Sequence, residues 1–190
     1  MHDARLLSFT KYTIIALILF TAAIICGGVG VGMLAGEDLE TLTNYMQGFF
    51  DSVPKVSAGL ALSSMKKYVL LWTIVFVSGF IMPGFILNAY TVAERGYVIG
   101  YTIGGFVRVY GAKGIFACCS LLPELLFYIP VFILFSSISL KMSFFKKDNK
   151  KIFLRKYVLT SFIFLSVFCV ISFLQTFLTT TFMSLISDRM

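Results

Sequence analysis

The sequence predicts an all-α integral membrane protein, a single polytopic domain over residues 1–190 with about five transmembrane helices. Two observations predict this class. Hydrophobic residues make up 58% of the chain and charged residues only 13%, well below the share of about a quarter that soluble domains carry. The apolar residues also gather in long runs, and a helix needs roughly 20 of them to cross the hydrocarbon core of a bilayer. We therefore expect a lipid bilayer to surround most of the chain.

The apolar runs predict a third span that is short and glycine-rich and a fourth that is broken by two prolines. The expected spans are residues 12–34, 68–87, 96–110, 115–140 and 157–186. The third and fourth runs can form two crossing helices, or one crossing helix and a segment that enters the membrane and returns. The first run is longer than the apolar region of a signal peptide, so we expect it to be retained.

The distribution of basic residues predicts the orientation. The linker over residues 141–156 carries seven Lys and Arg residues and one acidic residue, Asp148, which places it in the cytoplasm under the positive-inside rule. Arg5 and Lys11 place the N-terminus on the same side. An even number of crossings must then separate the N-terminus from this linker. The first four spans are therefore all expected to cross, and the C-terminus to lie outside.

The first outer loop is expected to contain an amphipathic helix over residues 37–52. Its apolar residues fall at helical spacing, and acidic and amide residues fill the other positions. The apolar positions are Leu39, Leu42, Met46, Phe49 and Phe50. Lipid-binding surface helices are normally basic, so the acidic face favours docking on protein. Either this chain's own spans or a partner protein could cover the apolar side.

Two ladders of glycines, each with a spacing of four residues, predict close helix packing, because residues four apart share one helix face. The ladders comprise Gly28, Gly32 and Gly36 in the first span, and Gly96, Gly100 and Gly104, with Gly105 beside them, in the third. For the later ladder we favour packing within the chain. For the first, internal packing and a partner remain open, including a homodimer. We expect Arg95 at the inner end of the third span and Arg108 at the outer interface.

Glu124 lies between Pro123 and Pro130 and is the intramembrane polar site of the expected fourth span. Its carboxyl group could accept hydrogen bonds from backbone freed by the proline, pair with Arg108 or Lys113, or carry a proton. The structural roles are favoured, because proton relays usually need a chain of ionisable groups and no second acidic residue is expected in the spans.

The inventory of reactive residues predicts neither an enzyme nor a cofactor or metal site. The single histidine, His2, lies in the N-terminal tail, so no HExxH motif and no histidine base for a membrane nucleophile is present. No Walker motif occurs. The cysteines lie in apolar runs without a metal-binding spacing, namely Cys26, Cys118, Cys119 and Cys169. Despite the net charge of +7, nucleic-acid binding is not expected, because the basic residues separate apolar runs.

A glycine motif followed at fixed spacing by Leu-Pro and Ile-Pro carries a family resemblance. It comprises Gly100, Tyr101, Thr102, Ile103, Gly104, Gly105, Gly111, Gly114, and the run Leu121, Leu122, Pro123, Glu124, Leu125, Leu126, Phe127, Tyr128, Ile129 and Pro130. With the glycine-rich first span, the outer helix and Leu71-Trp72 in the second span, this order of parts resembles the stage II sporulation protein M family over most of the chain. Many members carry Gln or His where this chain has Glu124.

The resemblance implies a non-catalytic scaffold in the bacterial plasma membrane. The family's name-giving member holds two peptidoglycan-degrading proteins at the septal membrane during engulfment, so wall hydrolases are the implied partners. Similar proteins occur in gene clusters for circular bacteriocins. An accessory or transport role in the secretion of, or immunity to, a circular bacteriocin, with a transporter ATPase complex as partner, is therefore the alternative.

Overall fold

The computed structural model describes residues 2–51, 58–81, 83–118, 121, 124–144 and 150–187. Regular structure in these ranges is helical. The helices are α1 (His2–Gly32), α2 (Glu37–Asp51), α3 (Ala58–Ser78), α4 (Gly84–Tyr110), α5 (Ala112–Cys118), the π-helical turn η2 (Glu124–Tyr128), α6 (Ile129–Ser143) and α7 (Lys150–Ser187).

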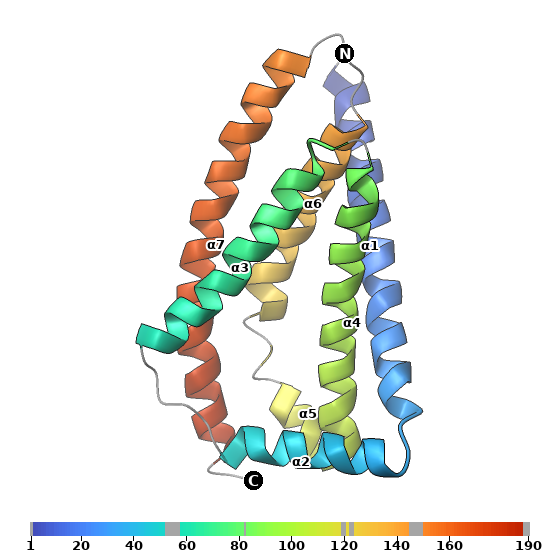
Figure 1. The fold of residues 1–190 in the computed structure, drawn as a ribbon, viewed down its shortest axis with the longest axis vertical. Helices are drawn as coiled ribbons and strands as arrows, with labels where there is room; N and C mark the ends of the chain where they lie inside the picture. The colour runs from blue at the N-terminus through green and yellow to red at the C-terminus, as the bar shows by residue number, and fades with distance from the viewer. Residues whose placement is uncertain are drawn as a thin grey trace.

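The long helices form an elongated bundle in which α1, α4, α6 and α7 run lengthwise and α3 crosses obliquely (Figure 1). The start of α1, the turn between α3 and α4, the end of α6 and the start of α7 lie at one end. At the other end lie α5, the end of α7 and α2, which runs across the bundle (Figure 1). The most extensive helix pair is α1 with α4, whereas α3 packs mainly on α7 and α4.

Among the described residues, three helical segments are long and apolar enough to cross a membrane. They are Thr10–Gly32 in α1, Leu125–Ser143 in η2 and α6, and Leu154–Leu174 in α7. Apolar side chains cover their outward surfaces: Ile18, Ile25, Leu159 and Val170 are 59–63% exposed. Such exposure is unfavourable in water and favourable in lipid. The helical membrane class predicted from composition is therefore supported.

The second expected span, residues 68–87, is divided in the structure. Helix α3 ends at Ser78, and α4 begins at Gly84 after a short reversal. Pro83 has no backbone N–H to continue a helix. Gly84 sits against the Ser78 carbonyl oxygen, where a β-carbon would overlap it. The backbone N–H of Gly84 donates to the Ile81 carbonyl at 2.9 Å, so the proline and the glycine together permit the tight turn.

The third expected span, residues 96–110, is only the second half of α4, which is 27 residues long. The polar residues assigned to a preceding loop are instead accommodated within the helix. Thr91 donates its hydroxyl hydrogen to the Leu87 carbonyl at 2.8 Å, and Asn88 is fully buried against α6. Because these groups form hydrogen bonds inside the bundle, they do not require a loop in water.

The fourth expected span, residues 115–140, corresponds to α5, η2 and α6, and the fifth, residues 157–186, lies within the longer α7. Pro130 occupies the first turn of α6, directly after the π-helical turn. The first turn tolerates proline because its N–H groups lack intrahelical partners. Pro123 lies outside the described residues, so the form of the break around it stays a prediction.

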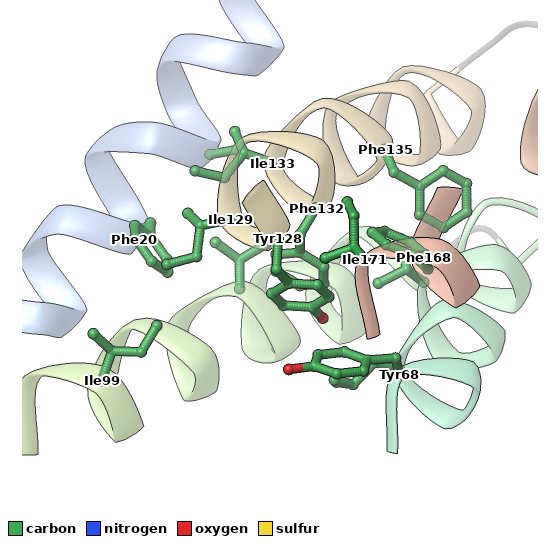
Figure 2. Close-up of a cluster of buried hydrophobic side chains, with 14 of the residues drawn as sticks. Phe20, Tyr68, Ile99, Tyr128, Ile129, Phe132, Ile133, Phe135, Phe168 and Ile171 are labelled. Carbon is green, nitrogen blue, oxygen red and sulfur yellow. The ribbon is translucent and has the colours of Figure 1, made fainter. Parts of the chain in front are cut away.

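Aromatic side chains of η2 and α6 pack against side chains of α7 and α3 (Figure 2). The rings of Tyr128 and Phe168 are 5.5 Å apart, and those of Tyr128 and Tyr68 are 4.5 Å apart. Phe132 and Phe135 complete the group, and all five residues are at most 8% exposed. Aromatic pairs at these separations add favourable electrostatic contact to their burial. This cluster holds the oblique α3 against the lengthwise helices.

Buried polar groups also join α3, α4 and α6. The Asn88 side-chain amide donates to the Ser136 carbonyl at 3.1 Å, and the Ser136 hydroxyl donates to the Asn88 amide oxygen. Ser139 of α6 and Ser78 of α3 each lie 2.7 Å from the Val75 carbonyl. In hydrocarbon such groups have no water to replace a lost partner, so these bonds fix the relative register of α3, α4 and α6.

We predict that the paired bonds between Asn88 and Ser136 stabilise the fold cooperatively. Unfolding of Asn88→Ala, Ser136→Ala and the double variant, measured in detergent, should give a coupling energy of about 0.6–1.7 kcal/mol, as found for hydrogen bonds in other membrane proteins. Thr102→Ala is the matched control, since among the described residues that hydroxyl bonds to Val98 of its own helix. Fully additive effects of the two substitutions would contradict the prediction.

Candidate functional site

The glycine ladder of α4 packs directly on the backbone of α1. A β-carbon at Gly96 would lie 2.6 Å from the Phe20 carbonyl oxygen, and one at Gly100 would overlap the carbonyl of Ile24. Only glycine lets the two backbones approach so closely. The contacts advance along both helices in the same direction, so α1 and α4 run parallel. The surface that could have been a partner groove is filled by the chain's own first helix.

The glycines of α1 divide into a covered and an open group. At Gly27 a β-carbon would overlap the backbone of α4, and Gly28 lies beside Gly104. Gly32 and Gly36 are exposed, and among the described residues no atom of a neighbouring segment lies within 4 Å of a β-carbon built at either position. Gly36 lies beyond the end of α1 with a φ of +61°, so it does not continue the helical ladder that the spacing predicted. The two ladders therefore share one interface at Gly28. A homodimer through Gly28, Gly32 and Gly36 stays a prediction, with only the last two free for a partner.

Helix α2 covers the end of the interface between α1 and α4. Leu42 and Met46 are 7% and 5% exposed and pack with Val31 and Phe106. Gly105 lies beneath Met46, whose terminal methyl group would be 2.7 Å from a β-carbon at that position. The chain's own helices thus cover the two central apolar residues of α2.

The remaining side chains of α2 separate into three groups. Leu39 is half-buried, whereas the side chains of Phe49 and Phe50 lie outside the described residues. Exposed residues form the opposite face of the helix, namely Glu37, Asp38, Glu40, Asn44 and Tyr45. An acidic surface with a tyrosine that is 70% exposed therefore faces away from the bundle.

Arg108 binds the chain just after α1. Its guanidinium group donates to the carbonyl of Leu34 at 3.2 Å, two residues beyond the end of the helix at Gly32. A basic side chain near a helix C-terminus also stabilises the partial negative charge there. The backbone of Glu124 begins η2, but its side chain lies outside the described residues. The three alternatives for its carboxyl group remain predictions.

Two charged residues of α4 lie deeper than the sequence indicated. We expected Arg95 at the inner interface, yet its neighbour Gly96 contacts Phe20, which is in the middle of the apolar segment Thr10–Gly32. Arg95 is half-buried, and its Nε atom has no hydrogen-bond partner among the described residues. Glu94 is exposed at the same depth. The sequence placed both in a loop, so a second acidic residue within the bundle was missed.

The sequence that forms this bundle matches a known protein family. The family model described as Stage II sporulation protein M matches residues 16–180. The chain belongs to the stage II sporulation protein M family. No similar sequence was found among curated proteins, and no similar fold among solved structures.

Membership of the stage II sporulation protein M family confirms the resemblance deduced from the glycine and proline motif. The matched range includes most of α1, all of α2 to α6 and most of α7. Both glycine ladders, the α2 cap and the charged pair of α4 therefore lie within the family region. Together with the three apolar segments, membership supports a multi-pass membrane protein.

We predict that Gly100→Leu disrupts the contact between α1 and α4, because the new side chain would have to occupy the position of the Ile24 backbone. Forced overpacking of this kind destabilises a fold by roughly 1–3 kcal/mol or more. The measurement is thermal unfolding of the purified protein in mild detergent. Gly32→Leu is the matched control, since the same substitution there meets open space. Equal unfolding temperatures for the two variants would contradict the internal interface.

Proposed function

We propose that this protein is a non-catalytic membrane scaffold that assembles partner membrane proteins, such as septal peptidoglycan hydrolases during engulfment. The observation that carries the proposal is its membership of the stage II sporulation protein M family. The described contacts support a binding role, because both central glycine surfaces are used inside the chain while the acidic face of α2 stays uncovered. Close internal packing together with uncovered surfaces is consistent with a scaffold role.

In the proposed orientation the N-terminus is cytoplasmic and the C-terminus lies outside the bacterial plasma membrane. The end that carries Lys11, Arg155 and Lys156 then faces the cytoplasm, in agreement with the positive-inside rule. Helix α2 lies at the opposite end of the bundle (Figure 1) and would face the cell wall. A wall hydrolase anchored in the same membrane would meet the acidic face of α2 there.

We predict that affinity purification from the native host in mild detergent recovers wall hydrolases with this protein. Neutralising the acidic face with Glu37→Gln, Asp38→Asn and Glu40→Gln should lower their yield several-fold, because the lost charges contribute to electrostatic complementarity. The control neutralises exposed charges at the other end, with Arg155→Gln and Lys156→Gln.

Each outcome of this purification has a distinct meaning. Loss of the hydrolases only in the α2 variant supports a scaffold that binds through its outer face. An equal yield from all variants would place the binding surface elsewhere. Recovery of a transporter ATPase or a secreted peptide in place of hydrolases would contradict the scaffold and support the bacteriocin secretion or immunity role.

A further inference from the structure

We propose that the outer face of α4 receives a partner's transmembrane helix that carries a basic side chain at mid-membrane depth, with the carboxylate of Glu94 as its acceptor. The outer face of α4 is defined as Ile86, Tyr90, Glu94, Tyr97 and Val98. This inference rests on the proposed scaffold function and specifies the chemistry of one partner. It concerns a surface inside the bilayer, distinct from the acidic face of α2.

The depth of Glu94 follows from the neighbours of α4 on two sides. Gly96 lies against Phe20, in the middle of the apolar segment of α1, and Asn88 is bonded to Ser136, within the apolar segment of α6. Glu94 is between these two levels on a continuous helix. At this depth the exposed side chains of α1 are hydrocarbon, such as Ile18 at 63% exposure. The carboxylate therefore lies where lipid chains surround the bundle.

The other sides of α4 are occupied. Its glycine ladder faces α1, and its Asn88, Val92 and Ile99 side is buried against the rest of the bundle. On the outer face, Tyr90 is 68% exposed, and Tyr97 and Val98 are each 44% exposed. Spacings of three and four residues place these side chains in one continuous stripe with Glu94 near its middle.

The acidic residue of this stripe does not suit lipid. Tyr90 lies near the start of α4, and the Tyr97 hydroxyl lies beside Gly30 near the end of α1, whereas Glu94 lies between them at mid-depth. Neither α4 nor α3 is among the described segments apolar enough to cross a membrane alone. Ionisable residues are unfavourable in hydrocarbon and are usually paired or turned to protein. A covering protein segment would remove this cost.

The negative charge of Glu94 determines which kind of partner fits this surface. Arg95 follows Glu94 directly, and adjacent helical residues do not face each other, so it belongs to another side of α4. An ionised carboxylate only accepts hydrogen bonds, so its partner must donate them. A two-fold homodimer through this face would bring two Glu94 carboxylates together, and like charges close together repel. A different protein with a Lys or Arg in its membrane helix fits the surface.

The test uses the full chain in phosphatidylcholine liposomes with synthetic Leu/Ala transmembrane peptides that carry Lys, Leu or Glu at the centre. Binding is measured by fluorescence energy transfer between labelled peptide and protein. We expect the Lys peptide to bind wild type at least about tenfold more tightly than Glu94→Gln, equivalent to about 1.4 kcal/mol. We expect the Leu and Glu peptides to bind both proteins weakly.

A matched control moves the carboxylate to another exposed membrane position. The double variant Glu94→Leu with Val170→Glu places it on α7, where Val170 is 59% exposed. We expect this variant to bind the Lys peptide as weakly as Glu94→Gln. Binding equal to that of wild type would show that any exposed carboxylate suffices and would overturn the assignment to α4. Equal Lys-peptide affinity for wild type and Glu94→Gln would overturn it as well.

Two further outcomes separate this inference from the scaffold proposal. Energy transfer between two labelled copies that is lost in Glu94→Gln and unaffected by Lys peptide would assign the surface to a homodimer and overturn the basic partner. If hydrolases co-purify from cells but the Lys peptide shows no preference for wild type, the scaffold stands and this surface is rejected. A clear peptide preference with no hydrolase recovered would retain the surface and reject the hydrolase partners.

Discussion

The close approach of the α1 and α4 backbones determines most of the remaining architecture. At Gly96 and Gly100 the facing carbonyl groups of Phe20 and Ile24 leave no room for a β-carbon. This contact holds α4 at the depth of the apolar segment Thr10–Gly32 of α1. The position of every other residue of α4 follows, including Asn88 in the polar bonds with α6, Gly105 beneath α2, and Glu94 on the outside.

Hydrogen bonds between the helices add to the glycine contacts. Asn88 and Ser136 bond α4 to α6, and the indole N–H of Trp72 donates to the Ser161 carbonyl at 2.9 Å, which ties α3 to α7. Tyr157 donates to the Phe76 carbonyl at 2.9 Å at the same junction. Contacts between glycine backbones set how closely two helices approach. Hydrogen bonds also require defined angles. The combination therefore specifies both the spacing and the rotation of the helices.

The sequence predicted the features that depend on local patterns. The apolar runs indicated the membrane class, the glycine spacing indicated a packed face, and the motif from Gly100 to Pro130 indicated the family. The apolar face of α2 was also predicted, and Leu42 and Met46 are the residues that become buried. These features could be predicted because periodicity and composition are local properties of the sequence and do not depend on what packs opposite each helix.

The features that depend on tertiary partners were missed. The expected spans 68–87 and 96–110 left Glu94 and Arg95 between them, because hydropathy is low where two charges are adjacent. The structure keeps them helical because α1, α3 and α6 surround much of α4. The reversal at Pro83 was hidden within a continuous apolar run, since the contact between Gly84 and the Ser78 carbonyl cannot be read from composition. The side chain of Glu124 lies outside the described residues, so its role is still a prediction.

The parallel contact between α1 and α4 also has a consequence for synthesis. Gly27 contacts the backbone at Tyr97, and at translation rates of about 5–20 residues per second the ribosome needs roughly 4–14 seconds to cover that separation. During this interval α1 is in the membrane with its glycine face uncovered. Helix α4, whose charges make it a poor span on its own, arrives when that face is already available. The first helix therefore serves as the template on which the least lipid-compatible helix enters the bundle.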